Sequence, residues 1–144
     1  MTTLLSPNFT LEELTHTDHR EFTNEPNDLE KNNLKRLAEL LEQVKGLLGG
    51  KPIMVNSGFR SKQVNDAVGS SDRSQHRVGA ACDFRVPSMT PNDVVKAIIA
   101  SDIPFDQIIR EFDRWTHISV PNEPTGKPRR QALIIDKMGT RTYS

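Results

Sequence analysis

The segment that determines how the chain turns back on itself at its candidate site reads Ser74-Gln75-His76-Arg77-Val78-Gly79-Ala80-Ala81-Cys82-Asp83. On a continuous helix, the seven positions from His76 to Asp83 would separate the two residues by about 10 Å along the axis. One metal ion with bonds of about 2 Å could not bridge that distance. The chain must therefore fold back between them, and Gly79 permits the backbone conformation that this requires. We expect a loop that carries His76 and a strand over residues 80–86 that carries Asp83.

A third candidate ligand, His117, lies in a strand-like run over residues 115–120. Alternation along a strand places His117 on the face opposite Thr116, Ile118 and Val120. Two histidines and one carboxylate, with a fourth position left for water, are the ligand type of a catalytic zinc site. Such an ion lowers the pKa of its bound water towards about 7 and polarises a carbonyl oxygen. His76, Asp83 and His117 are therefore the predicted ligands of one Zn²⁺ per chain.

The composition excludes several classes of protein. The 144 residues include 19 Lys plus Arg and 19 Asp plus Glu, so the formal net charge is zero, which argues against a nucleic-acid partner bound by bulk attraction to phosphates. A single cysteine excludes an intramolecular disulfide framework and a Cys-rich zinc site. No run approaches the roughly 20 apolar residues that span a bilayer. Residues 1–7 lack the basic start and apolar stretch of a signal peptide, so we expect synthesis in the cytoplasm without one.

The pattern of apolar residues and helix caps predicts one domain over residues 1–144. Its class is α+β, with a small, mostly antiparallel sheet packed against helices. Residues 1–27 are expected to form a short helix and a loop, and residues 137–144 a loose tail. The predicted helices cover residues 10–14, 28–48, 61–68 and 90–100, and the predicted strands cover residues 52–56, 80–86, 105–112, 115–120 and 131–135.

A general base near the metal could come from Glu111 or Asp113. Along one extended strand, the six positions from Glu111 to His117 would span about 20 Å, so a hairpin is needed to bring the two together. With residues 113–115 as a three-residue loop, Glu111 lies opposite His117 with β-carbons about 5 Å apart. Asp113 would then sit exposed at the loop tip, where its pKa is hard to raise. We therefore expect Glu111 to be the base and keep Asp113 as the alternative.

Three motifs in order resemble those of the zinc D-alanyl-D-alanine carboxypeptidase family, a group of peptidoglycan metallopeptidases. They are Ser57-Gly58-Phe59-Arg60-Ser61, then Ser74-Gln75-His76 with Gly79, Ala81 and Asp83, then Glu111 with Trp115 and His117. The start at residues 5–14 is also similar to that of single-domain members from phage endolysins, so the resemblance extends over residues 5–135. Phe59 replaces the commoner Tyr of the first motif, which removes one hydroxyl group.

The resemblance implies a zinc site in a cleft on the sheet, as in the hedgehog and D-Ala-D-Ala peptidase fold. It implies His76, Asp83 and His117 as ligands, Glu111 as the base and Arg60 as the cation that contacts the substrate carbonyl and oxyanion. Ser74 and Gln75 would face the substrate, and we expect Trp115 to form a wall of the cleft. The implied activity is hydrolysis of peptide bonds in peptidoglycan stem peptides by a monomer. It would act at the cell wall, in the periplasm or outside the cell, with phage delivery as one route.

Two other functions remain open at this point. Hedgehog signalling domains use the same fold without this catalysis, so the chain could be a metal-bearing module that binds cell wall or a partner. It could also be a cytoplasmic dipeptidase for free D-Ala-D-Ala. The sequence leaves open which bond is cut, whether the enzyme is an endopeptidase or a carboxypeptidase, and how it reaches the wall. The basic residues 127–130 are interpreted as a solvated loop, with contact to an anionic wall polymer as the alternative.

Overall fold

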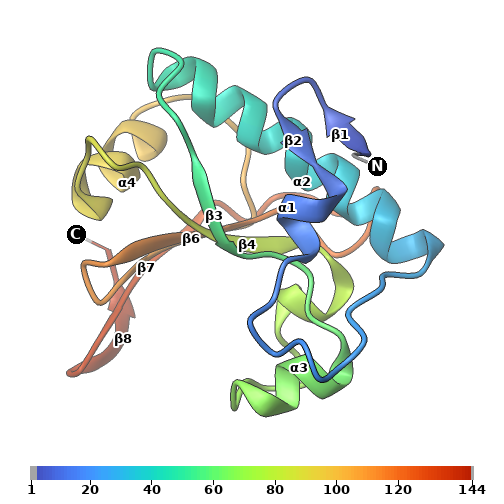
Figure 1. Cartoon of the computed structure of the whole chain (residues 1–144). Coiled ribbons are helices and arrows are strands. Elements are labelled where there is room, and N and C mark those ends of the chain that lie inside the picture. The colour runs from blue at the N-terminus through green and yellow to red at the C-terminus, as the bar shows by residue number, and fades with distance from the viewer. Residues whose placement is uncertain (1–2, 144) are drawn as a thin grey trace.

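A six-stranded sheet forms the centre of the fold, and its order is β3-β4-β6-β5-β7-β8 (Figure 1). The computed structural model describes residues 3–143. Residues 1 and 2 of the predicted domain and residue 144 of the predicted tail lie outside the described residues. Neighbouring strands are antiparallel except β5 and β7, which are parallel. The strands are β3 (Met54–Ser57), β4 (Ala81–Arg85), β5 (Gln107–Glu111), β6 (Trp115–Ser119), β7 (Gln131–Asp136) and β8 (Gly139–Thr142).

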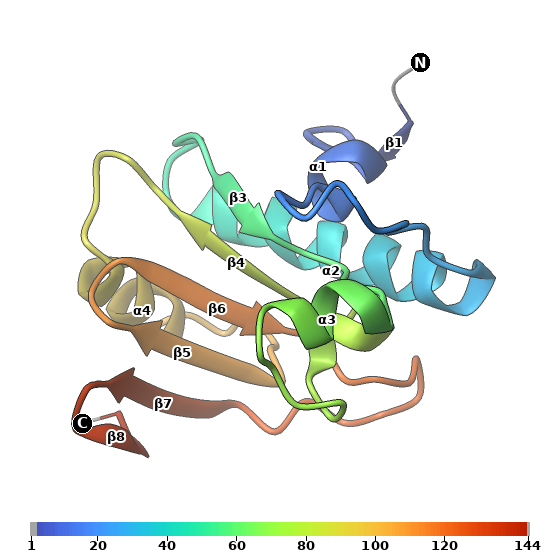
Figure 2. The ribbon, with the colours of Figure 1, turned by 60° about the horizontal axis from the view of Figure 1, so that its bottom comes forward.

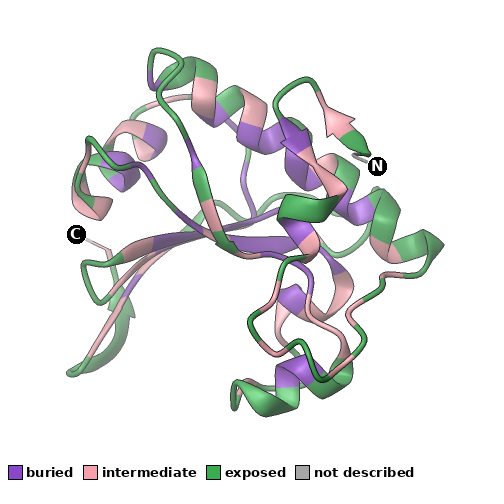
Figure 3. Cartoon of the chain, in the orientation of Figure 1, coloured by how far each residue is buried: buried purple, intermediate pink, exposed green. Residues whose placement is uncertain are grey.

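Two helices, α2 (Asp28–Leu47) and α4 (Pro91–Ile99), cover one face of the sheet (Figure 2). Residues of α2, α4 and the central strands include many that are buried (Figure 3), and their apolar side chains form the core between the helices and the sheet. From the strands they include Phe84, Ile108 and Ile118, and from the helices Leu37, Leu41, Val95 and Ile98. The predicted α+β class with a mostly antiparallel sheet against helices is confirmed. Among residues 3–143, no helix is both long and apolar enough to cross a bilayer.

Local signals in the sequence account for where the helices begin. In α2, the side chain of Asn27 accepts a hydrogen bond from the backbone N–H of Glu30, and the Glu30 carboxylate accepts one from the N–H of Asn27. This reciprocal capping satisfies two donors that a helix start leaves unpaired. The same arrangement joins Thr10 and Glu13 at α1 (Leu11–Thr15), which lies close to the predicted helix over residues 10–14.

The fold-back between the first two candidate ligands follows the predicted route. His76 lies in η1 (Gln75–Val78), a short 3-10 helix that ends at Gly79, and β4 begins two residues later. Gly79 has φ +77°, and a β-carbon there would lie 2.7 Å from the carbonyl oxygen of Glu30. Only glycine meets both the conformational and the steric requirement. The helix before this loop, α3 (Lys62–Ala67), is capped by the Ser61 side chain.

The two ends of the described chain differ from the expectations. Residues 139–142 form β8, which pairs antiparallel with β7, so the prediction of a loose tail over residues 137–144 is wrong. The pattern gave no sign of this strand because all four of its residues are exposed, which leaves it without the apolar alternation of a half-buried strand. Near the start, β1 (Leu4–Ser6) and β2 (Phe9–Thr10) form a small unpredicted two-stranded sheet before α1.

Candidate metal centre

The three predicted ligands come together on the sheet face opposite α2 and α4. Asp83 in β4 is directly paired with His117 in β6, so both side chains project from the same face. His76 approaches from η1, and its side chain is buried. Oδ1 of Asp83 lies 2.9 Å from Nδ1 of His117 and 3.4 Å from Nε2 of His76. One ligand atom from each residue lies within 4.8 Å of the others.

This donor set fits a zinc ion. Tetrahedral zinc with bonds of about 2.0–2.1 Å places neighbouring ligand atoms about 3.3 Å apart, close to the two distances from the Asp83 carboxylate. Nδ1 of His76 lies 2.7 Å from the carbonyl oxygen of Gly58. Since a carbonyl can only accept, Nδ1 carries the hydrogen and Nε2 keeps its lone pair for a metal. A backbone partner on the outer nitrogen is the usual way in which a ligating histidine is oriented.

Close packing against α1 explains why the first motif contains a glycine at position 58. A β-carbon on Gly58 would lie 2.3 Å from the carbonyl oxygen of Leu14 in α1. The next residue, Phe59, donates its N–H to the same oxygen at 2.7 Å. The close packing of α1 therefore positions the carbonyl that orients His76.

The protonation states of the ligands suit metal binding. Burial lowers the pKa of His76, which favours the neutral imidazole that a metal requires. For Asp83, burial alone would raise the pKa, but His76 and His117 outweigh it and hold the carboxyl pKa well below its usual range. The centre therefore presents one carboxylate and a neutral His76 around one point.

The candidate base lies beside the ligands, but in a different hairpin register from the one predicted. Glu111 is paired with Trp115, and His117 is paired with Ile109, so the expected pairing of Glu111 with His117 is wrong. The connection is residues 112–114, in which Phe112 and Asp113 have φ of +54° and +52° and Arg114 donates its N–H to the Glu111 carbonyl. Because the shift preserves the alternation of faces, Glu111 still points to the metal side.

The surroundings of Glu111 are those of a proton acceptor. Its Oε1 lies 4.0 Å from Nδ1 of His117, and its Oε2 accepts a hydrogen bond from Nε1 of Trp115 at 3.0 Å. Burial, and next to it the charge of Asp83, raises the pKa of Glu111 above its ordinary value, which makes the carboxylate a stronger base. Asp113 is 71% exposed and paired with Arg110 at 3.1 Å. The structure therefore favours Glu111 over Asp113.

Arg60 reaches the same centre from the segment before α3. Its Nη2 lies 4.0 Å from Oδ2 of Asp83, and its backbone N–H donates to the His76 carbonyl. Burial lowers the pKa of Arg60, and the charges of Asp83 and Glu111 oppose this; a guanidinium nevertheless stays charged near neutral pH. Within residues 3–143, its buried Nε has no hydrogen-bond partner. Its Nη1 donates to Oδ1 of Asn65 at 3.4 Å, and the guanidinium has further N–H groups for an additional acceptor.

Ser74 and Gln75 make hydrogen bonds within the fold. Oγ of Ser74 accepts a hydrogen bond from the backbone N–H of His76. Nε2 of Gln75 lies 2.9–3.1 Å from acceptors on Asp106, Val120 and Asn122. These bonds hold the η1 segment, and the expected contact of both residues with substrate stays a prediction.

Sequence reasoning missed Asp106, whose carboxylate joins the η1 segment to the loop over residues 121–130. It accepts hydrogen bonds from the Arg129 guanidinium and backbone and from the Gln75 amide. Arg130 in turn donates to backbone carbonyls at the end of α4 and in the segment that follows it, and it lies over the Phe105 ring. Both arginines of the basic stretch are therefore engaged within the fold, which disfavours the interpretation of this loop as an anionic-polymer site. Nothing in the local pattern around Asp106 signals these long-range partners.

Comparisons with known proteins agree with the motifs. A family described as Peptidase M15 matches residues 7–119, a range that includes all three predicted ligands, Glu111 and Arg60. The chain is also 43% identical over 44 residues to the zinc D-Ala-D-Ala carboxypeptidase of Streptomyces albus G. That alignment covers 31% of this chain and 17% of the relative, so the chain matches only about a sixth of that protein's length.

The family match extends over most of the chain and contains the η1–β4 fold-back, the β5–β6 hairpin and the residues that meet at the metal centre. This confirms the resemblance found in the sequence motifs. The chain belongs to the Peptidase M15 family.

Proposed function

We propose that the chain is a zinc-dependent peptidase that hydrolyses peptide bonds in peptidoglycan stem peptides. The observation that carries the proposal is the placement of a carboxylate of raised pKa, Glu111, beside the cluster of His76, Asp83 and His117. The family match supports a peptidase. The name of the relative, a zinc D-Ala-D-Ala carboxypeptidase, supports zinc and the class of substrate.

The chemistry divides between the ion and the protein. Zinc bound by the three ligands would supply an activated water molecule and polarise the scissile carbonyl. The Glu111 carboxylate would take one proton from the attacking water as the water oxygen adds to the carbonyl carbon. The proton then moves from Glu111 to the departing nitrogen as the C–N bond breaks, so the products are a carboxylic acid and an amine, which ionise at neutral pH to a carboxylate and an ammonium group. Glu111 is unchanged at the end of the cycle.

Two other side chains support this reaction. The guanidinium of Arg60 lies on the Asp83 side of the centre, with Nη2 4.0 Å from Oδ2 of Asp83, where it can donate to the carbonyl oxygen as negative charge develops. The Trp115 indole holds Oε2 of Glu111 at 3.0 Å, which leaves Oε1 on the side of His117. Each role follows from a contact that already exists in the fold.

We propose further that the enzyme acts as a monomer at the cell wall, in the periplasm or outside the cell, as a D-Ala-D-Ala-type carboxypeptidase or an endopeptidase. Delivery by a phage, with lysis as the outcome, is one route. The alternative of a metal-bearing binding module is disfavoured because such a module needs neither Glu111 nor the Arg60 guanidinium beside the candidate ligands. A cytoplasmic D-Ala-D-Ala dipeptidase would use the same centre.

Product analysis tests the proposal directly. Zinc-loaded protein is incubated with purified peptidoglycan, with intact soluble muropeptides and with free D-Ala-D-Ala, and products are identified by mass spectrometry. New amines and carboxylates within stem peptides are expected, and their masses identify the bond and distinguish terminal from internal cleavage. Cleavage of free D-Ala-D-Ala alone would support the dipeptidase, and no cleavage by a fully zinc-loaded chain would overturn the proposal.

A further inference from the structure

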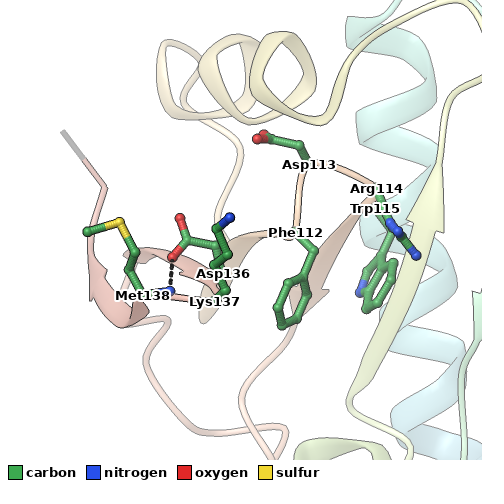
Figure 4. Close-up of a pocket in the computed structure, with 7 residues that line it drawn as sticks. All are labelled: Phe112, Asp113, Arg114, Trp115, Asp136, Lys137 and Met138. Carbon is green, nitrogen blue, oxygen red and sulfur yellow. Dashed lines mark hydrogen bonds between the residues drawn. The ribbon is translucent and has the colours of Figure 1, made fainter.

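A hollow lined in part by Trp115 lies at the turn end of the β5–β6 hairpin. It is a cavity of about 560 Å³ between two turns, residues 112–115 and residues 136–138. Figure 4 shows the Phe112 ring between Trp115 on one side and the β7–β8 turn on the other. We call this cavity the turn cavity.

The turn cavity shares a wall with the candidate base. Trp115 lines it, and the indole of the same residue donates its Nε1–H to Oε2 of Glu111. Oε1 of Glu111 is in turn 4.0 Å from Nδ1 of His117. A substrate held at the metal centre could therefore extend past Trp115 into the turn cavity.

The lining includes apolar side chains that the fold leaves exposed. Met138 is 84% exposed and Phe112 is 46% exposed, and the Phe112 ring centroid lies 6.0 Å from that of Trp115. Phe112 also adopts φ +54°, a left-handed conformation that bulky residues rarely take. Exposed apolar groups gathered around one hollow are typical of a binding site.

The charges around the turn cavity are unbalanced once internal ion pairs are counted. Asp113 is paired with Arg110, and Asp136 is paired with Arg141 through two hydrogen bonds. Arg114 and Lys137 also line the cavity, and within residues 3–143 neither has an acidic side chain within ion-pair distance. The available charge at this rim is therefore positive and complements a carboxylate.

We propose that the turn cavity is a specificity subsite for the part of the peptide substrate that extends beyond the scissile bond, and that it selects a segment with a free carboxylate. The inference rests on the proposed function and adds a recognition element to it. Phe112, Trp115 and Met138 pack against the peptide, while Arg114 and Lys137 attract its carboxylate. Stem peptides offer such groups on their acidic and diamino-acid residues.

Reversal of the two free charges tests this subsite. We compare kcat/KM for two soluble stem-peptide fragments that differ only in whether the carboxylates outside the scissile bond are free or amidated. The wild type is expected to prefer the free form. In the double variant Arg114→Glu/Lys137→Glu, kcat/KM for the free fragment divided by kcat/KM for the amidated fragment should fall about tenfold. The change should come from KM, and its size is that expected for reversing two partly exposed charge contacts. Lys35→Glu, on the exposed side of α2, is the matched control and should leave the ratio unchanged.

A second variant separates recognition from folding. Phe112→Gly removes the ring and also relieves the left-handed conformation, so KM should rise for both fragments without a loss of unfolding free energy. If the wild type cleaves both fragments and neither variant changes KM or the ratio, the subsite is wrong while the proposed function stands. If the zinc-loaded wild type cleaves neither fragment, the proposed function fails and the subsite with it.

Discussion

Nδ1 of His117 lies 2.9 Å from Oδ1 of Asp83 because the two residues are directly paired across β6 and β4. The sheet register therefore positions two of the three candidate ligands, and only His76 depends on a loop. This loop is itself held by Gly79 and by the bond from His76 to the Gly58 carbonyl. A centre assembled in this way should exist before the ion arrives, at little conformational cost on binding.

The first prediction concerns metal affinity. Loss of a group that orients a metal ligand weakens metal binding roughly 10–100-fold. His117→Ala should weaken zinc binding by more than this, because it removes one of the three protein ligands. Titration against a competing chelator, with zinc per chain measured on the purified protein, checks this. His19→Ala, which alters a partly exposed histidine beside Glu21, is the control and should bind zinc as the wild type does. Equal affinity in the two variants would contradict the assignment of His117.

The second prediction separates the two candidate bases. Glu111→Gln should lower kcat about 10²–10⁴-fold, the usual contribution of a general base, and should retain zinc because the amide replaces no ligand. Asp113→Asn should keep nearly full activity, since it breaks only an exposed pair with Arg110. Rates on muropeptides and zinc content are measured on both proteins. A larger loss in Asp113→Asn than in Glu111→Gln would make Asp113 the base.

The third prediction concerns the buried carboxylate of Asp106, which is 4% exposed. Hydrogen bonds from Arg129 hold its pKa below the ordinary value of 3.8, so the carboxylate stabilises the fold above that pH and this contribution is lost as the pH falls below it. Asp106→Asn should lower the unfolding free energy by about 1–3 kcal/mol at neutral pH, the cost of a lost bond to a charged group.

Urea unfolding of Asp106→Asn and the wild type at several pH values checks this. The difference between the two proteins should shrink below about pH 4, the ordinary range of an aspartate. Asp136→Asn, which removes an exposed pair with Arg141, is the control and should change stability much less. A difference that stays constant down to the lowest pH would exclude the proposed charge effect.

The fourth prediction uses two glycines with almost the same backbone conformation. Gly69 and Gly79 have φ of +74° and +77°, but only at Gly79 would a β-carbon meet other atoms, 2.7 Å from the Glu30 carbonyl oxygen. Gly69→Ala should therefore cost about 1–2 kcal/mol of unfolding free energy, for the left-handed conformation alone. Gly79→Ala should cost more and should also weaken zinc binding, because His76 shifts. Equal costs in the two variants would show that the contact with α2 is unimportant.

Several elements of the fold were predictable because their signals are local. The helix caps at Thr10 and Thr90, which begin α1 and α4, act within a few residues, as does the apolar spacing of α2. The strand that carries Asp83 and the hairpin that carries His117 were also expected. By contrast, the exposed strand β8 has no apolar alternation and is stabilised by pairing with β7, and the parallel pairing of β5 with β7 joins segments that are far apart in sequence.

The register of the β5–β6 hairpin could not be predicted from the local sequence. A three-residue connection starting at Phe112 or at Asp113 satisfies the same alternation, so both registers place Glu111 and His117 on one face. The observed register also lets the backbone N–H of Phe112 donate to the carbonyl oxygen of Ile135 in β7. That bond exists only once the sheet is assembled, which is why it could not be read from residues 105–120.

The sequence alone predicted His76, Asp83, His117 and Glu111 as one site from residue type, spacing and alternation, and the motif resemblance added Arg60. The fold brings these five side chains together. Folding in three dimensions was needed to establish the distance from Glu111 to the ligands, the bonds that hold Gln75 through Asp106, and the turn cavity beside Trp115. These features depend on contacts between segments distant in sequence. Their geometry is set by packing of the whole sheet, which no local pattern encodes.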